Sequence, residues 1–305
     1  MSAGYTGYLV RDSLDDDGTV PAKGSQYHSP DILVLPPTDT TDKKSLAYDE
    51  DPNKPVEKNH TKYRVYVRAK NLGATKLSGY KARIYRNCPS LLTHSREWSQ
   101  ERLKTPSGDS FLEIPSANSQ EIVVTTDYFE LDISQATNNC LVLAVTDGPE
   151  LEFPDEIDDM PKFLAARQYV CMRNVKLGYT SDNFHEEYVR YSVSEGHNYQ
   201  FSISAKGTFP AKTKFNIHCA ELGIYDAEKN LSSKMTYATP TVVLVEPYTA
   251  TKSHNANIRV SFLLPNDAHV EGDMSVNLIQ SKVIDAVEQR ILRRLGVYNL
   301  VAHGN

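Results

Sequence analysis

The sequence lacks the features that would place the chain in a membrane or on nucleic acid. No apolar run approaches the ~18–20 residues that cross a bilayer, and the first residues show neither the basic nor the apolar region of a secretory signal. Because phosphates demand a basic face, the net charge of −6 argues against nucleic acid and against anionic lipid. We expect synthesis in the cytoplasm, and export by a route that needs no signal peptide stays open.

The chain also lacks recognisable catalytic motifs. It contains no HExxH, no P-loop, no GxGxxG after a strand and no GxSxG, and no two of its nine histidines are spaced i, i+2 or i, i+4. His218 and Cys219 are neighbours, but adjacent residues of a strand point to opposite faces and cannot form a thiol dyad. We therefore predict that the protein is not an enzyme.

Cysteine, glycine and tryptophan are all sparse. The four cysteines, Cys88, Cys140, Cys171 and Cys219, form no CxxC and lie in or beside apolar runs, which predicts buried, reduced thiols. The 15 glycines argue against backbone loops that cradle phosphate. Tyrosine, by contrast, occurs 18 times, beside nine phenylalanines and one tryptophan. Because tyrosine suits strand surfaces and interfaces, this surplus favours a binding or assembling surface.

The clearest local pattern is an alternation over residues 63–70, which predicts a strand with one face on a core and one in water. Further short strands are predicted around residues 5–11, 29–34 and 80–85, and three more before residue 146. Several short strands without a convincing helix are typical of an immunoglobulin-like sandwich. The two faces of the alternating strand are Tyr63, Val65, Val67 and Ala69, and Arg64, Tyr66, Arg68 and Lys70.

The second half repeats this pattern and then changes period. We predict a first β-sandwich over residues 1–150, an acidic linker over 151–165, and a second β-sandwich over 166–278. Residues 279–305 are predicted to form a C-terminal amphipathic helix and tail. The fold class is therefore all-β, with two tandem immunoglobulin-like sandwiches and one short helix. The apolar stripe of that helix packs on the second sandwich or docks another subunit, and comprises Ile284, Val287, Ile291 and Leu295.

An acidic turn early in the chain raises the question of calcium. Asp12, Asp15 and Asp17 are candidate ligands, because Ca²⁺ prefers carboxylate oxygens. The EF-hand pattern fails: with Gly18 at loop position six, position twelve falls on Gly24 and not on a glutamate. A solvated turn and an irregular calcium site both remain open, and no other cofactor is predicted.

The early motifs resemble those of a known family. Residues 10–21 (VRDSLDDDGTVP), 29–32 (SPDI) and 66–73 (YVRAKNLG) are similar to the CARDB-like, immunoglobulin-type modules of bacterial surface and exported proteins. The resemblance covers about the first 105 residues. It implies a β-sandwich with a binding or scaffold role, and the family carries no catalytic residues to transfer to this chain.

Three hypotheses for function follow. The first is a non-enzymatic structural or interaction protein that binds a protein partner or forms a homo-oligomer, through sheet edges and the C-terminal helix. The second is a secreted or injected toxin component that binds a target cell or membrane. The third is a carbohydrate-binding module that uses Trp98 and surface tyrosines on a glycan. The missing catalytic motifs and the tyrosine surplus favour the first.

Overall fold

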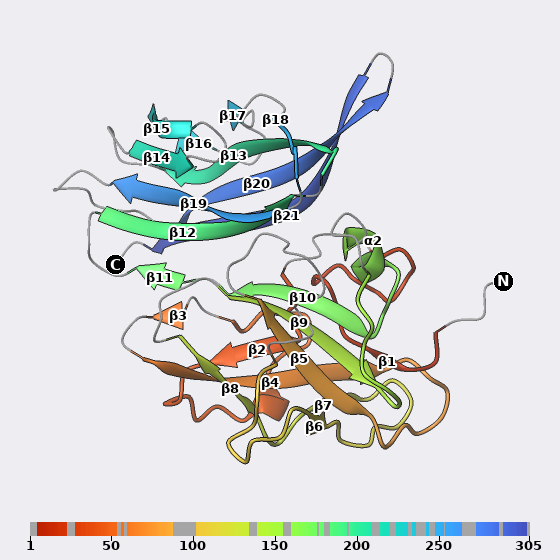
Figure 1. Cartoon of the computed structure of the whole chain (residues 1–305). Helices are drawn as coiled ribbons and strands as arrows, with labels where there is room; N and C mark the ends of the chain where they lie inside the picture. The colour runs from red at the N-terminus through yellow and green to blue at the C-terminus, as the bar shows by residue number, and fades with distance from the viewer. Residues whose placement is uncertain are drawn as a thin grey trace. The chain divides into compact units, whose positions relative to one another are not determined.

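The described part of the chain folds almost entirely into β-strands, as the computed structural model shows (Figure 1). The helices among the described residues are the short α2 (Met160–Ala165) and a 3₁₀ turn, η1 (Lys43–Ser45). The all-β class is therefore confirmed, whereas the arrangement as two immunoglobulin-like sandwiches stays a prediction. By its contacts the chain divides into two compact units. The first comprises Met1–Asn87, Ser95–Ala136 and Cys140–Val175, and the second comprises Lys176–Asn305 with the short segments Cys88–His94 and Thr137–Asn139.

The structure describes most of the first unit and the strands of the second. Within this part of the chain, no helix is long and apolar enough to cross a membrane. The described residues are 5–22, 28–53, 56–57, 60–87, 102–133, 139–154, 160–175, 177–179, 184–193, 195–208, 214–219, 224–230, 234–235, 242–243, 248–252, 254–263, 273–286 and 289–303.

The first sheet of the first unit is built around one long strand, β4 (Lys62–Asn71). Two short strands from earlier in the chain, β1 (Tyr8–Leu9) and β2 (Ile32–Leu35), pair antiparallel with β4. Two strands from later in the chain, β7 (Ile122–Val124) and β8 (Phe129–Asp132), do the same. β4 thus brings together segments that lie far apart in the sequence.

β4 has buried residues on both faces, whereas its alternation predicted one face in water; of the second face, Arg64 and Lys70 are partly exposed. On the second face, Tyr66 packs in a small apolar cluster with Leu33 and Val124, and Arg68 has no exposed surface. The segment around η1 supplies the cover, since Leu46 packs against this cluster. The predicted inner face is confirmed, because each of its residues is at most 4% exposed: Tyr63, Val65, Val67 and Ala69.

The second sheet of the first unit has the strand order β10–β9–β5–β6. Residues 140–145 of β9 and all of β10 are buried, so burial is continuous along these strands and does not alternate. In β9 it follows a continuous apolar run, whereas β10 also buries Arg173 and Asn174. A further short strand, β3, also belongs to this unit. The bounds are β3 (Val56–Glu57), β5 (Lys81–Asn87), β6 (Leu112–Glu113), β9 (Asn139–Thr146) and β10 (Val170–Val175).

The division by contacts differs from the predicted boundary at residue 150. β10 lies in the predicted second domain, yet it joins the sheet of the first unit, where Val145 N donates to Tyr169 O at 2.9 Å. The predicted linker contains α2, whose Phe163 and Leu164 are buried. These apolar side chains fix the segment to the first unit, a role that its acidic composition concealed.

The second unit contains two sets of paired strands. One runs β16–β13–β20–β21–β11, with β17 and β18 also paired to β13, and the other runs β12–β19–β14–β15. β11 pairs parallel with β21, and the remaining registers given for this unit are antiparallel. The bounds are β11 (Leu177–Tyr179), β12 (Phe184–Val193), β13 (Asn198–Thr208), β14 (Lys214–Cys219), β15 (Ile224–Asn230), β16 (Lys234–Met235), β17 (Val242–Val243), β18 (Tyr248–Thr249), β19 (His254–Leu263), β20 (Asp273–Ala286) and β21 (Gln289–His303).

The helix predicted within residues 279–305 is wrong, because the described residues of this segment lie in the antiparallel hairpin of β20 and β21. Ile284 stands opposite Ile291, and Leu295 lies within β21, while Val287 is outside the described residues. A short apolar run fits a helical stripe and a strand alike. The segment forms a strand and not a helix because β20 pairs with β13, a tertiary contact that no local sequence pattern reveals.

Candidate functional site

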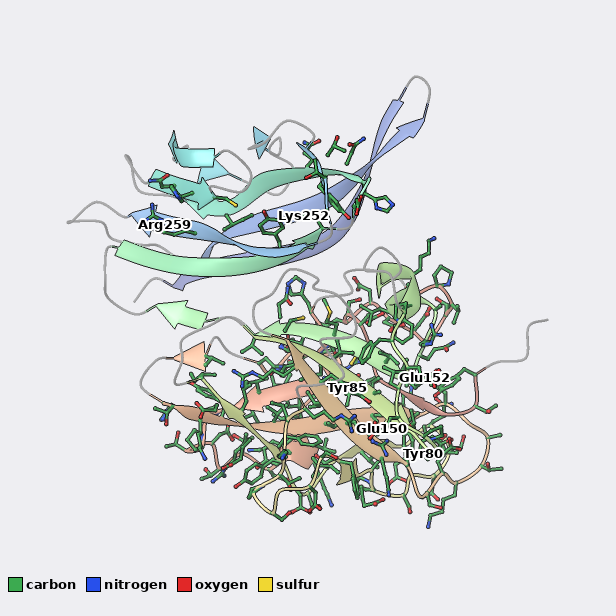
Figure 2. The ribbon with its side chains drawn as sticks, in the orientation of Figure 1. Tyr80, Tyr85, Glu150, Glu152, Lys252 and Arg259 are labelled. Carbon is green, nitrogen blue, oxygen red and sulfur yellow. The ribbon has the colours of Figure 1, made fainter. Side chains whose placement is uncertain are left out.

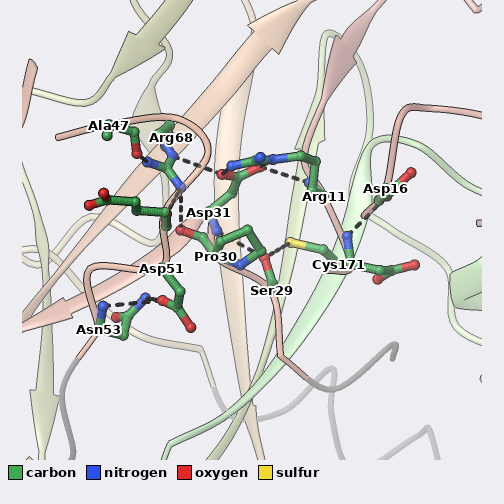
Figure 3. Close-up of polar contacts among 12 residues, drawn as sticks. Arg11, Asp16, Ser29, Pro30, Asp31, Ala47, Asp51, Asn53, Arg68 and Cys171 are labelled. Carbon is green, nitrogen blue, oxygen red and sulfur yellow. Dashed lines mark hydrogen bonds and ion pairs between the residues drawn. The ribbon is translucent and has the colours of Figure 1, made fainter. Parts of the chain in front are cut away.

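Three early sequence motifs meet in a cluster of buried charges around Asp31 (Figure 3). Arg11 donates to both carboxylate oxygens of Asp31, through Nε at 3.1 Å and Nη2 at 2.8 Å. Arg68 Nε donates to the same carboxylate at 2.8 Å. Burial by itself lowers the pKa of Arg11, but its hydrogen bonds and charge pairing with Asp31 raise the pKa overall. One carboxylate therefore joins two guanidinium groups where little water screens them.

The Arg68 guanidinium also fixes the segment that covers β4. Its Nη1 donates to Ala47 O at 2.7 Å and its Nη2 donates to Glu50 O at 3.2 Å. The Tyr48 ring lies 3.5 Å from the guanidinium carbon of Arg11 and 5.3 Å from that of Arg68. Sequence alternation placed Arg68 on a solvent face, but here it satisfies carbonyl groups of the covering segment.

A second ion pair continues this cluster on β10. Arg173 donates from Nη2 to Asp51 at 3.0 Å and from Nη1 to the Ser29 carbonyl. Ser29 Oγ donates to Cys171 Sγ at 3.1 Å and accepts from Asp31 N at 3.2 Å. Arg11, Arg68 and Arg173 are thus each bound to a carboxylate, and these contacts join the early segments to β4 and β10.

The described cysteines are buried free thiols. Cys140, Cys171 and Cys219 are each at most 2% exposed, which confirms the prediction for these three. Burial raises the pKa of Cys171, so the thiol stays protonated and is a poor nucleophile. Cys88 lies outside the described residues.

The acidic turn separates the three candidate calcium ligands. Asp12 is 1% exposed, whereas Asp15 and Asp17 are exposed. Asp16 closes the turn by accepting from Asp12 N at 3.0 Å and from Gly18 N at 2.9 Å. Among the described residues, no group of three or more His, Cys, Asp or Glu side chains could hold a metal ion. Calcium binding here stays a prediction that the geometry does not support.

A groove of about 640 Å³ opens on the surface of the first unit. Four separate segments form it: the chain before β1, the residue before β5, the loop after β9, and the turn between α2 and β10. Its volume lies within the range of small-ligand sites. The lining comprises residues 5–7, Tyr80, residues 145–152, Arg167 and Tyr169.

Tyrosine rings give the groove its apolar surface. Tyr5 stacks on Tyr169 with ring centroids 6.4 Å apart, and Tyr80 packs edge-on against Tyr8 at 5.0 Å. The Tyr5 hydroxyl donates to Tyr8 O at 3.1 Å. Burial is the largest cause that raises the pKa of Tyr5 and of Tyr80, and the nearby charge of Asp147 adds to it in each case. Both phenols therefore remain neutral hydrogen-bond donors near pH 7.

Carboxylates line the same groove (Figure 2). Arg102 binds both oxygens of Glu150, one of them at 2.6 Å, and this pairing lowers the pKa of Glu150. Asp147 and Glu152 are exposed, and neither has a hydrogen bond or ion pair with another described residue. Arg167 Nη1 is already bound to a carbonyl of α2 at 3.1 Å. With Arg102 and Glu150 paired, the two carboxylates of Asp147 and Glu152 outnumber the one guanidinium of Arg167, so the groove presents a net negative charge beside aromatic rings.

Sequence reasoning missed this groove. The acidic linker predicted over residues 151–165 begins within it, at Leu151 and Glu152, but no residue of that segment was assigned to a site. The tyrosine surplus was the available signal, although it does not say which tyrosines meet. Trp98, the predicted ligand-binding aromatic, lies outside the described residues.

Comparison with known proteins finds weak structural similarities only. No protein-family model and no curated protein matches the chain. The CupB6 tip adhesin of Pseudomonas aeruginosa is 7% identical, with a TM-score of 0.24 over 80% of this chain and 90% of the adhesin. CfaE, the adhesive subunit of CFA/I fimbria of enterotoxigenic Escherichia coli, is 8% identical, with a TM-score of 0.20 over 98% of this chain and 94% of CfaE.

A transglutaminase is also similar at this level. Red sea bream transglutaminase is 10% identical, with a TM-score of 0.21 over 80% of this chain. The chain spans 29% of the length of that enzyme. Because every one of these TM-scores is below 0.25, these similarities carry no information on the function of this chain.

Proposed function

We propose that this protein is a non-enzymatic interaction protein that binds a partner at the groove of its first unit. The observation that carries the proposal is a concave surface where tyrosine rings adjoin the carboxylates of Asp147 and Glu152. Binding sites combine an aromatic surface with a few polar groups that fix orientation. The buried ionisable residues around Asp31 support the same view, because they are bound to one another and not gathered at the groove.

The proposal is tested by filling the groove. Gly148 lines it, and a Cβ added at this residue would meet no atom within 4 Å. Gly148→Trp therefore places an indole in the groove without a steric clash at its base. Ser119→Trp adds the same side chain to an exposed turn elsewhere and is the matched control. All three full-length proteins are applied to peptide and glycan arrays.

The expected result is a set of ligands bound by the unmodified chain and by Ser119→Trp but lost with Gly148→Trp. Ligands on glycan spots alone would select the carbohydrate-binding alternative at the same groove. Equal binding by all three proteins, or no binding by any, would overturn the proposal.

Self-association is a second candidate, and the β20–β21 hairpin favours it. β13 pairs with β20 as far as Lys282, and beyond this point β20 and β21 pair only with each other among the described strands (Figure 1). This arm contains Val283 opposite Leu292 and Ile284 opposite Ile291. A two-stranded hairpin with apolar residues is marginal in water, so a second copy of the chain would stabilise it.

Light scattering over a hundredfold range of concentration tests this candidate. Ile284→Thr together with Ile291→Thr keeps strand propensity but removes apolar surface from the arm. We expect the unmodified chain to associate and this variant to dissociate, while Ile122→Thr, a change to an exposed isoleucine of β7, has no effect. A monomeric unmodified chain at every concentration would refute self-association.

The CARDB-like resemblance remains part of the proposal. Modules of that family imply a binding or scaffold role, and their motif residues in this chain include Arg11, Asp31 and Arg68. These residues supply the rigidity of the unit that carries the groove. The toxin hypothesis gains no observation from the described residues.

A further inference from the structure

We infer that the groove binds a cationic side chain, a lysine or arginine of a basic segment in a partner protein. This inference rests on the proposed function and deepens it by naming the chemical class of the ligand. Three features of the groove carry it: its aromatic rings, its free carboxylates and its open shape.

The aromatic rings provide the first half of the recognition. An ammonium or guanidinium group is attracted to the face of a tyrosine ring within about 6 Å of its centroid. Tyr5 and Tyr169 are stacked, and Tyr80, the residue directly before β5, lines the same groove. The phenol groups of Tyr80 and Tyr169 have no hydrogen bond to another described residue, so both are available to a ligand.

The carboxylates provide the second half and set the sign of the ligand. Asp147 lines the same groove as Tyr5 and Tyr80, so a cation at these rings also meets that carboxylate. Glu152 adds a second carboxylate without an ion pair to a described residue, so the free carboxylates of the groove outnumber its one guanidinium, that of Arg167. An anionic ligand would be repelled by both groups, and the net charge of −6 would oppose its approach. Charge complementarity therefore selects a basic partner.

The shape of the groove selects a peptide over a single small cation. About 640 Å³ exceeds what one lysine side chain fills, and the wall at Gly148 carries no side chain. A short extended segment of the partner could thus place one basic residue between the tyrosine rings of the groove and Asp147. It could place a second basic residue near Glu152. Such binding gains from charge-assisted hydrogen bonds and weakens as salt screens the charges.

Fluorescence anisotropy with a fluorescein-labelled pentalysine peptide tests the inference on the full-length chain. Its Nε-acetylated form keeps the aliphatic stems and removes the charges. Asp147→Asn with Glu152→Gln removes the two free carboxylates of the groove. Glu113→Gln with Asp127→Asn makes the same change in net charge at exposed positions that do not line it. Tyr80→Leu removes one aromatic face.

We expect pentalysine to bind, and acetylation to weaken binding at least tenfold. The groove carboxylate variant should also lose at least tenfold, Tyr80→Leu several-fold, and the control variant less than twofold. Equal losses in the groove and control variants would overturn the inference, because they would show unspecific attraction to an acidic surface. No binding of pentalysine would overturn it as well.

Failure of this inference is distinguishable from failure of the proposed function. If the acetylated peptide or a neutral glycan binds as well as pentalysine, and Gly148→Trp abolishes that binding, then the groove is a site and only the cationic ligand class is refuted. If Gly148→Trp changes no binding, both are refuted.

Discussion

At the scale of single residues, Asp12 is a carboxyl group that the fold buries without a hydrogen-bond partner. Both of its side-chain oxygens are unpaired. Burial, and then the charge of Asp16, raises its pKa from 3.8 to about 8. The folded state therefore holds a proton that the unfolded state releases at lower pH. The contribution of this protonation to the free energy of unfolding is fully present below about pH 4 and is lost as the pH rises through about 8.

Asp12→Asn should remove this pH dependence. Between about pH 4 and pH 8 the unmodified chain should lose up to about 1.4 kcal/mol of unfolding free energy per pH unit from this group, and the variant should not. Urea unfolding of both proteins at several pH values measures the difference in slope. Asp15→Asn, an exposed neighbour, is the control and should keep the original slope. Parallel slopes for Asp12→Asn and the unmodified chain would show that Asp12 is ionised in the folded state.

Arg68 tests the buried charge cluster at the same scale. Arg68→Lys keeps the charge but loses the planar fork that serves Asp31, Ala47 and Glu50 at once. We expect a loss of about 3 kcal/mol in unfolding free energy, measured by urea unfolding. Arg64→Lys is the same change on the same strand at a partly exposed residue, and should cost less than about 1 kcal/mol. Similar losses in both variants would mean that the cluster contributes little.

At the scale of elements, the sequence predicts those strands whose pattern is local. Tyr63, Val65 and Val67 alternate and are buried as expected, because one sheet face is enough to impose that pattern. The burial of Arg68 was not predictable, since it depends on a segment some twenty positions earlier that folds back over β4. The C-terminal hairpin escaped prediction for the same reason: its strand state is set by its pairing with β13.

A pair of cysteines distinguishes the hairpin from the helix. Lys282 and Arg293 are opposite each other in the β20–β21 register, where Cα atoms lie about 4.5–5.5 Å apart. In a helix the same residues would be about 16 Å apart. Lys282→Cys with Arg293→Cys should therefore form a disulfide on mild oxidation, detected by mass spectrometry of peptides. Lys282→Cys with Arg290→Cys is out of register and should form little. Little disulfide from Lys282→Cys with Arg293→Cys would contradict the hairpin.

At the scale of the whole molecule, function is assigned to a groove that no single segment contains. Tyr5, Tyr80, Asp147 and Tyr169 come from four parts of the chain and meet only because β1, β5, β9 and β10 belong to one unit. Sequence composition indicated a tyrosine-rich binding protein without a catalytic motif. It could not indicate the groove, because the distances between these residues are fixed by tertiary pairing alone.

The central claim is that the groove is where this protein meets its partner. Hydrogen–deuterium exchange of the full-length chain, with and without a ligand found on the arrays, tests it most directly. The account predicts slower exchange in residues 5–9, 145–152 and 167–170 on binding, and unchanged exchange in β7 and β8. Slower exchange confined to residues outside the groove would contradict it.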